Sequence, residues 1–304
     1  MPKLTIFTPS YNRAHTLQRT YESLCRQNCK DFLWLIVDDG STDGTMEIVR
    51  QWQTRDNGFE IQYIHKDNGG LHTAYNTAIA ELSTELAVCV DSDDWLADEA
   101  VERILFKWAS DGNDNVAGIE ALDCYASGEI IGDLLPNCET INLIDLYVGN
   151  YHIKNGDRKP IVRSDLYKSV APMPTMNGEK NFNPHYMHLQ ISLKYDFLVM
   201  NEPVCFVEYQ PDGMTRNIFK QYLDSPNSFA QLRRLCMSFQ NVPLIFRIKN
   251  AIHYVSSCLL AGRTQSIWKD STQPFLTCFV LLPGVLLSIL TRILAKRHSR
   301  EIKQ

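Results

Sequence analysis

Short apolar runs alternate with amphipathic stretches through the first hundred residues. The runs are brief and mostly β-forming, which is typical of strands buried in a sheet. The stretches between them repeat apolar residues at helical spacing. The predicted strands cover residues 3–8, 32–37, 61–64 and 86–90, and the predicted helices cover 16–27, 45–54, 73–82 and 96–107. Such alternation predicts a mainly parallel sheet with helices on both faces.

The polar loops that follow these strands hold the candidate chemistry. Right-handed crossovers place such loops at one edge of a parallel sheet, where open α/β sheets bind ligands. Three carboxylates, Asp91, Asp93 and Asp94, follow the fourth strand within four positions. Like charges this close need a compensating cation, and hard oxygen ligands suit Mg²⁺ or Mn²⁺ that also contacts phosphate. The alternative is a solvated acidic turn or a helix N-cap. We expect a nucleotide site at this edge.

Composition narrows the class of protein. The 304 residues have room for one large α/β domain or two smaller ones. A net charge of -5 gives no reason to expect nucleic acid as a partner. The nine cysteines contain no Cys-x-x-Cys pair, which argues against a zinc site or a disulfide framework. We therefore expect a reducing, cytoplasmic compartment, and no cleavable signal peptide is visible.

The second half continues the α/β pattern and then changes character. Strands are predicted at 116–119 and 129–131, a helix at 141–148, and two strands around Pro203 within 197–209. From Ser271 to Thr291 no residue is charged, although Pro283 and Gly284 interrupt the run. A basic segment follows, with one acid, Glu301, against Arg292, Lys296, Arg297, Arg300 and Lys303.

An apolar segment beside basic residues favours the cytoplasmic face of a membrane. We expect residues 275–294 to form a monotopic, re-entrant or interfacial anchor. A soluble helical tail and a true membrane span are the alternatives. The predicted location is thus cytoplasmic, peripherally associated with the inner face of the cell membrane.

Four motifs occur in order across residues 3–110. They are Thr8-Pro9-Ser10-Tyr11-Asn12-Arg13, Val37-Asp38-Asp39-Gly40-Ser41-Thr42-Asp43-Gly44-Thr45, Asn68-Gly69-Gly70 with Asn76, and Asp91-Ser92-Asp93-Asp94. In this order they resemble the inverting family 2 glycosyltransferases of GT-A fold. The resemblance implies a glycosyltransferase domain over residues 1–215, with a nucleotide-binding half at 1–110 and an acceptor-side half at 111–215. Residues 216–304 would form a helical, membrane-associating tail.

The resemblance also implies roles for individual residues. Thr8, Pro9, Tyr11 and Arg13 match the loop around the nucleobase, and Asp39 matches the acid that pairs with the base N–H. Lys66 and His72 lie near the positions that approach the diphosphate. Asp91, with Ser92 beside it, matches the ribose position, and Asp93 with Asp91 matches the metal site. One departure is Ala74-Tyr75-Asn76 where the family usually has Ala-Arg-Asn, so His72 is expected to replace that arginine.

Candidates for the catalytic base lie further along the chain. An inverting transfer needs a group that deprotonates the acceptor hydroxyl. Gly178-Glu179-Lys180 resembles the family's Gly-Glu-Asp element with lysine in place of the final acid, and it nominates Glu179. The alternative for Glu179 is a surface acid paired with Lys180 or with the N-terminus of the following helix. His185 is the second candidate, because a neutral imidazole suits this task near pH 7. Arg216 is expected to contact the diphosphate.

These inferences predict an inverting, metal-dependent enzyme that uses Mn²⁺ or Mg²⁺. We expect it to transfer a sugar from a UDP-linked donor to a glycan or lipid-linked glycan of a bacterial surface polysaccharide. One alternative is a sugar-1-phosphate nucleotidyltransferase, which would want a Gly-x-Gly-Thr-Arg loop where this chain has Thr8-Pro9-Ser10-Tyr11. The other is a non-catalytic, membrane-anchored protein that binds a nucleotide sugar.

Overall fold

The computed structural model describes residues 2–154, 156–210 and 218–301, with side chains described up to residue 297. The chain divides into two compact units. The first comprises residues 1–173 and 187–208, and the second comprises residues 174–186 and 209–304. Segment 174–186 thus belongs with the carboxyl-terminal helices rather than with the sheet that precedes it in the sequence.

The first unit contains the sheet and its covering helices. Its elements are β1 (Leu4–Ser10), α1 (Ala14–Arg26), β2 (Phe32–Asp38), α2 (Thr45–Gln53), β3 (Glu60–His65), α3 (Leu71–Glu81), β4 (Leu86–Cys89), β5 (Trp95–Leu96), α4 (Ala100–Asp111), β6 (Val116–Tyr125), β7 (Thr140–Ile141), α5 (Leu143–Val148), β8 (Arg158–Arg163), α6 (Ser164–Val170) and β9 (Asp196–Val207). Helix α7 (His185–Ile191) begins in segment 174–186 and ends in the first unit.

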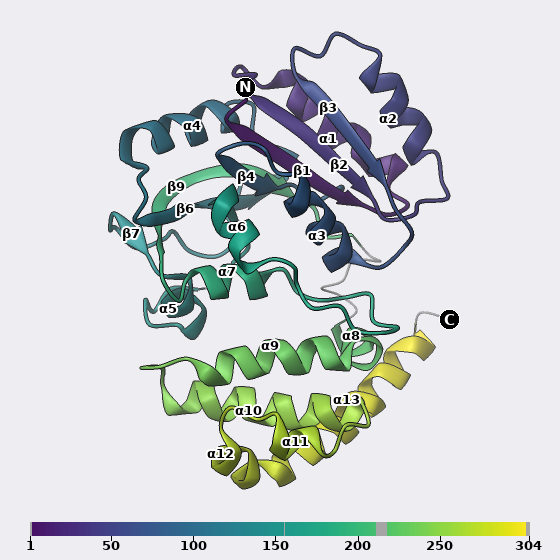
Figure 1. Ribbon diagram of the computed structural model, residues 1–304, viewed down its shortest axis with the longest axis vertical. Helices are drawn as coiled ribbons and strands as arrows, with labels where there is room; N and C mark the ends of the chain where they lie inside the picture. The colour runs from purple at the N-terminus through teal and green to yellow at the C-terminus, as the bar shows by residue number, and fades with distance from the viewer. Residues whose placement is uncertain (1, 155, 211–217, 302–304) are drawn as a thin grey trace. The chain divides into compact units, whose positions relative to one another are not determined.

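The nine strands form one mixed sheet in the order β3-β2-β1-β4-β8-β6-β9-β5, with β7 paired to β9 (Figure 1). Strands β1 to β4 are parallel to one another and are joined through α1, α2 and α3. This part confirms the strand–helix alternation and the α/β class predicted from the sequence. Strand β8 then runs antiparallel to both β4 and β6.

Strand β1 shows how helices come to cover both faces of the sheet. Successive side chains of a strand point to opposite faces. Leu4 and Ile6 join the buried cluster to which α1, α2 and α4 contribute. Phe7 instead makes edge-to-face ring contacts with Tyr75 of α3 and Tyr167 of α6. The continuous apolar run of β1 is therefore the signature of a strand buried on both faces.

Three element predictions were wrong in detail. Residues 95–96 form β5, and the helix expected from residue 96 begins at Ala100. The two strands expected around Pro203 are one strand, β9, because Pro203 lies at a register irregularity opposite Leu122, where a missing N–H is tolerated. The segment expected to form a strand at 129–131 makes only an isolated bridge, between Ile130 and Cys124.

The second unit is helical. It contains α8 (Ile218–Asp224), α9 (Pro226–Ser238), α10 (Leu244–Leu260), α11 (Ser266–Lys269), α12 (Pro274–Phe279) and α13 (Leu281–Glu301). Its small core includes Met237 of α9 and Ala251, Tyr254 and Val255 of α10. The long apolar run divides at Val280 rather than at Pro283-Gly284, since Pro283 falls in the first turn of α13, where its missing N–H costs nothing. Within the described ranges, no helix is both long and apolar enough to cross a bilayer.

Candidate active site

The loops that follow β1, β2, β3 and β4 are tied together by backbone hydrogen bonds at the carboxyl edge of the sheet. The amide of Asp39 donates to the carbonyl of Ser10 at 2.8 Å, and the amide of Lys66 donates to the carbonyl of Asp38 at 2.9 Å. The amide of Val90 donates to the carbonyl of Phe7 at 3.0 Å. These bonds continue the parallel ladders one residue beyond the strands. The first residues of all four loops are therefore held side by side at this edge.

Asp39 joins the second and third motifs. Its carboxylate accepts hydrogen bonds from the ammonium of Lys66 at 2.6 Å and from the amides of Gly69 at 3.0 Å and Gly70 at 2.7 Å. Only 3% of Asp39 is exposed. Gly70 has a φ of 94°, a conformation that glycine adopts without strain. The acid expected to meet the nucleobase therefore holds the 66–70 loop in place.

Asn12 joins the first and second motifs. It adopts a φ of 53°, a left-handed conformation in which asparagine is enriched. Its amide donates to Oγ of Ser41, and its side-chain oxygen accepts from the amide of Thr42, both at 2.8 Å. Beside it, 48% of Tyr11 is exposed. An aromatic ring is thereby presented to solvent on a loop fixed by its neighbours.

The remaining residues predicted for nucleotide binding differ in how far they reach the surface. Arg13, Lys66 and Asp91 are partly or fully exposed, whereas Pro9 and Ser92 are buried. Thr8 is also buried, and its hydroxyl accepts a hydrogen bond from the indole of Trp34 at 2.9 Å. His72 is 1% exposed at the start of α3. Thr8 and His72 thus contribute to the packing beneath the loops.

The acidic loop after β4 places its carboxylates in different environments. Asp91 is exposed, Asp93 is half-buried, and Asp94 is buried. Burial and the negative charge of Asp91 raise the pKa of Asp93, and the positive charges of Arg13 and Arg19 oppose that rise. Arg13 of the first motif is therefore electrostatically coupled to Asp93 of the fourth. Two parts of the predicted site that are eighty residues apart along the chain are thus close enough for their charges to interact.

Asp91 and Asp93 suit a divalent cation. Their mutual repulsion is the feature that a cation would relieve, and carboxylate oxygens are ligands that Mg²⁺ prefers. Among the residues that the structure describes, no group of three or more His, Cys, Asp or Glu side chains could hold a metal ion. The two carboxylates of Asp91 and Asp93 match the usual mode of Mg²⁺ binding, in which one or two carboxylates hold the ion and phosphate and water complete its coordination shell.

Arg19 of α1 braces this loop, and the sequence reasoning missed it. Its guanidinium donates to the carbonyl of Asp93 at 2.6 Å and lies 3.9 Å from the ring centroid of Trp95. It also forms a 2.5 Å ion pair with Glu208. Helical spacing places Arg19 on the polar side of α1, and nothing local in the sequence marks its partner more than seventy residues away.

A second feature that was missed is a group of buried charges beside the acidic loop. Lys159 of β8 lies 3.6 Å from both Asp94 and Asp123. Burial raises the pKa of Glu120 to about 8 and that of Asp123 to about 6. Within the described part of the chain, Oε2 of Glu120 and Oδ1 of Asp123 are buried without hydrogen-bond partners. The sequence offered no signal for this group, because Glu120 and Asp123 lie beyond the strand predicted at 116–119 and Lys159 lies in no predicted strand.

Glu179, the first candidate for the base, caps a helix in the second unit. One carboxylate oxygen accepts from the amide and the side-chain nitrogen of Asn227 at 2.8 and 2.7 Å. The other accepts from the amide and hydroxyl of Ser228 at 2.8 and 2.6 Å. Only 7% of Glu179 is exposed. Glu179 therefore pairs with a helix N-terminus, as the alternative above supposed, but the helix is α9 rather than the one that follows directly, and the acid is buried rather than at the surface.

The other predicted residues lie in different parts of the fold. His185 begins α7, and burial lowers its pKa to about 4, so its imidazole is neutral at pH 7. Asn76 of the third motif exchanges two hydrogen bonds with the backbone of Met173. Arg216, expected at the diphosphate, lies outside the described residues. The tyrosine that replaces the family's arginine, Tyr75, is buried against Phe7.

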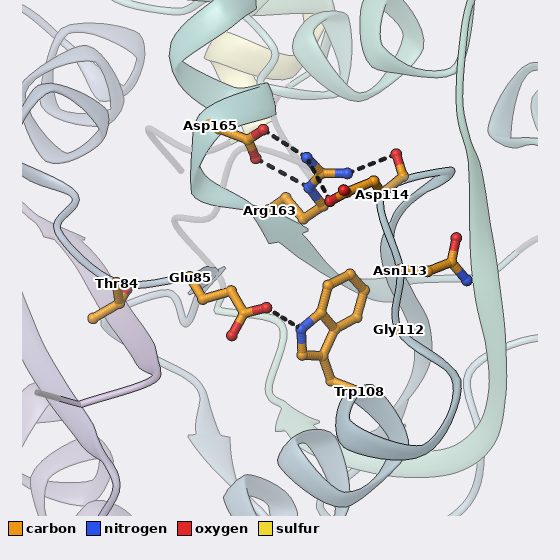
Figure 2. A pocket seen from close by; sticks show the side chains of 8 residues that line it. All are labelled: Thr84, Glu85, Trp108, Gly112, Asn113, Asp114, Arg163 and Asp165. Atoms are coloured by element: carbon orange, nitrogen blue, oxygen red, sulfur yellow. Dashed lines mark hydrogen bonds and ion pairs between the residues drawn. The ribbon is translucent and has the colours of Figure 1, made fainter.

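A pocket of about 320 Å³ lies away from these loops (Figure 2). Thr84 and Glu85 in its lining precede β4, so it is next to the amino end of that strand, whereas Asp91 follows the carboxyl end. Four of its polar side chains are paired with one another. Trp108 donates to Glu85 at 2.7 Å, and Arg163 pairs with Asp165 at 2.7 Å. The pocket is therefore separate from the candidate active site.

Residues 5–131 match the family model described as glycosyl transferase family 2. This part of the chain belongs to that family. The match covers β1 through β6 and so includes all four loops of the candidate site. The family resemblance inferred from the four motifs is thereby confirmed.

One relative of the family 2 domain is the putative teichuronic acid biosynthesis glycosyltransferase TuaG of Bacillus subtilis. It is 32% identical over 106 residues, which are 34% of this chain and 42% of TuaG. The chain thus spans less than half the length of this curated relative.

Two solved structures share the fold. One is Staphylococcus aureus TarS 1–349 in complex with UDP-GlcNAc, with a TM-score of 0.60 at 15% identity over 98% of this chain and 92% of TarS. The other is the mannosyltransferase PcManGT of Pyrobaculum calidifontis in complex with GDP-Man and Mn²⁺. It has a TM-score of 0.57 at 16% identity over 95% of this chain and 87% of PcManGT. These likenesses confirm the GT-A fold.

Proposed function

We propose that this protein transfers a sugar from a UDP-linked donor to a glycan or lipid-linked glycan acceptor in the synthesis of a bacterial surface polysaccharide. The observation that carries the proposal is the gathering of the four family 2 motifs at one edge of the sheet, through the contacts of Asp39 and Asn12. The assignment of TuaG to teichuronic acid biosynthesis supports a polysaccharide acceptor, and the TarS complex with UDP-GlcNAc supports a UDP-sugar donor.

The donor's nucleoside fits the first two motifs. The exposed ring of Tyr11 offers a surface for stacking a base, and the carboxylate of Asp39 can accept from a base N–H. Lys66 and Arg13 supply positive charge for the diphosphate. Asp39 and Lys66 already form an ion pair. Donor binding would therefore place the base next to Asp39 and the phosphates next to Lys66.

A Mn²⁺ or Mg²⁺ ion held by Asp93 and Asp91 would neutralise the diphosphate and stabilise the departing nucleoside diphosphate. The presence of Mn²⁺ in the PcManGT complex supports a divalent cation as a cofactor. The chain's own contribution is to hold the carboxylates in position, because Arg19 fixes the Asp93 backbone and Lys159 lies beside Asp94.

Inversion requires attack on the anomeric carbon from the face opposite the leaving diphosphate, while a base takes the proton of the acceptor hydroxyl. His185 stays the second candidate for this role, although burial lowers its pKa to about 4 and so makes its imidazole a weaker base than an ordinary histidine. The lone pairs of Glu179 are directed at α9. Because these hydrogen bonds occupy the carboxylate of Glu179, they also favour the second candidate function, binding of a nucleotide sugar without transfer.

Thermal unfolding with UDP tests the proposal. A ligand at 100 times its Kd adds about 2.7 kcal/mol to the free energy of unfolding. We expect UDP with Mn²⁺ to raise Tm and Asp93→Asn to abolish the metal-dependent part, while the matched control Glu129→Gln, an exposed acid outside the motifs, leaves it unchanged. Absence of a shift with any nucleotide would overturn the assignment. Binding without transfer or donor hydrolysis would favour the binding-only candidate.

A further inference from the structure

The helices α12 and α13 carry an apolar face that is turned toward solvent. Its largest side chains are Phe275, 94% exposed, Phe279, 83%, Leu282, 68%, Leu286, 58%, and Ile293, 57%. Phe275 and Phe279 are one turn apart on α12, and the spacing of four and seven from Leu282 to Leu286 and Ile293 follows one side of α13. Ile289 and Leu290 continue the same stripe and are about half exposed. We refer to residues 275, 279, 282, 286, 289, 290 and 293 as the docking face.

The opposite side of α13 is buried, although its residues are small or polar. Gly284, Ser288, Thr291 and Ala295 lie there, a full turn or nearly so apart. A Cβ on Gly284 would come within 2.4 Å of Val255 in α10, so close helix packing depends on this glycine. The hydroxyls of Ser288 and Thr291 donate to the carbonyls of Val285 and Leu287 in their own helix.

Helix α13 is thus inverted relative to an ordinary surface helix. A helix on a water-soluble surface buries its large apolar side chains and exposes its polar ones. Here the large side chains are outside and the hydroxyls are inside. A contiguous exposed apolar surface of this kind is characteristic of an interaction site, because exposing it to water is unfavourable.

The charges next to the docking face have one sign. Arg292, Lys296 and Arg297 are exposed at its carboxyl-terminal end. From Ser271 to Arg300 the sequence contains no acidic residue, in a protein whose net charge is -5. The local surface is therefore complementary to an anionic partner, against the charge of the chain as a whole.

We propose that the docking face binds the surface of a bilayer that contains anionic phospholipids. The two phenylalanines and the leucines would enter the boundary between head groups and acyl chains, and the basic side chains would contact lipid phosphates. In the described residues no helix is able to span a bilayer, so the helices would lie in the plane of the surface. A second copy of the chain fits less well, since this face has no acid to pair with the partner's arginines and lysine.

Flotation of the full-length protein with vesicles tests this. Vesicles of phosphatidylglycerol and phosphatidylethanolamine should bind the protein, and vesicles of pure phosphatidylcholine should bind it far less. The double variant Phe275→Ser/Phe279→Ser should lower the partition coefficient at least about tenfold, because two phenyl groups no longer leave water. Phe106→Ser is the matched control, since Phe106 is 76% exposed on α4, outside the docking face, and its loss should change nothing.

The basic residues are tested by Arg292→Gln/Lys296→Gln. Each charge removed should weaken binding to anionic vesicles about fivefold, with a smaller salt dependence than the wild type. Absence of vesicle binding would overturn the proposal, as would binding that Phe275→Ser/Phe279→Ser leaves intact. A dimer in sedimentation velocity that this variant dissociates, without vesicle binding, would assign the face to self-association instead. Stabilisation by UDP, measured on the same samples, reports separately on the proposed sugar transfer.

Discussion

The ammonium of Lys66 lies 2.6 Å from the carboxylate of Asp39, and this ion pair connects the loop after β2 to the loop after β3. Asp39 is almost wholly buried, and its other bonds go to the amides of Gly69 and Gly70. The pair therefore has a structural consequence even before a nucleotide is bound. It fixes the position of a positive charge and of two backbone amides at the same edge of the sheet.

Replacing Lys66 with methionine should weaken both folding and donor binding. A hydrogen bond to a charged, mostly buried acceptor contributes about 1.5–3 kcal/mol, and loss of the charge also removes attraction for the diphosphate. We expect urea unfolding to show a loss of about that size and calorimetry to show UDP binding at least about tenfold weaker. Lys107→Met is the control, because Lys107 pairs with Asp111 on an exposed helix surface and should matter by about 0.5 kcal/mol or less. Equal effects of the two variants would contradict the role given to Lys66.

Replacing Glu179 separates capping from catalysis. Its four accepted hydrogen bonds at the start of α9 predict that Glu179→Gln lowers the free energy of unfolding by roughly 2–4 kcal/mol, since an amide cannot accept from all four donors. Turnover of the folded variant at low temperature should fall much less than stability. If kcat collapses while Tm stays at the wild-type value, Glu179 is the base after all. His185→Ala, assayed beside it, should abolish turnover and leave UDP binding unchanged.

The buried Glu120 should make stability depend on pH. Burial raises its pKa in the folded protein to about 8, above its ordinary value of about 4.5. Between these values the folded state holds a proton that the unfolded state has released, so stability falls as the pH rises, by at most about 1.4 kcal/mol per pH unit. Asp123, with a pKa of about 6, adds a loss of the same sign below pH 6.

Urea unfolding at pH 5, 6, 7 and 8 measures this dependence, and Glu120→Gln is the informative variant. Glutamine does not titrate, so we expect the decline between pH 6 and 8 to become markedly shallower. The nearby cations Arg158 and Lys159 oppose the shift and stay charged in both proteins, which makes the comparison a direct one. Parallel stability curves for wild type and variant would show that Glu120 does not titrate in this range.

Arg19 should matter more to the site than its surface position suggests. Arg19→Lys keeps the charge but loses the planar fork that contacts the Asp93 carbonyl, Glu208 and the ring of Trp95 together. We expect UDP binding in the presence of Mn²⁺ to weaken about tenfold and binding without metal to change little. Arg26→Lys is the control, because Arg26 pairs only with exposed Asp98 in the contacts described. A loss that is equal with and without Mn²⁺ would mean that Arg19 acts on the whole fold rather than on the acidic loop.

Local pattern and one topological rule were enough to predict the parallel part of the sheet, β1 to β4, and the helices between these strands. The apolar runs that form β1 to β4 and the helical repeats between them are properties of adjacent residues. The right-handed crossover then brings their loops to one edge without any further information. This is why the contacts around Asp39 and Asn12 fall among residues already singled out by their motifs. The fold class and the family followed from the same stretch of about a hundred residues.

Other features depend on partners that are distant in the sequence. Glu179 resembles a catalytic acid by its neighbours, yet its role depends on α9, which starts nearly fifty residues later. In the sequence Lys159 is a single charged residue with no visible partner. In the structure β8 places it beside Asp94 and Asp123. Pro203 was expected to end a strand, and the irregular pairing with β6 accommodates it.

The apolar tail shows most clearly what the sequence predicts and what tertiary packing decides. Its composition predicts a segment that avoids water, and its periodicity is compatible with either side of α13 facing inward. Packing decides the matter, because only a helix face as small as that at Gly284 can approach α10 closely enough. The large side chains are left outside as a result. Hydrophobicity is a property of each residue, but which face is buried depends on the shape of the surface that it meets.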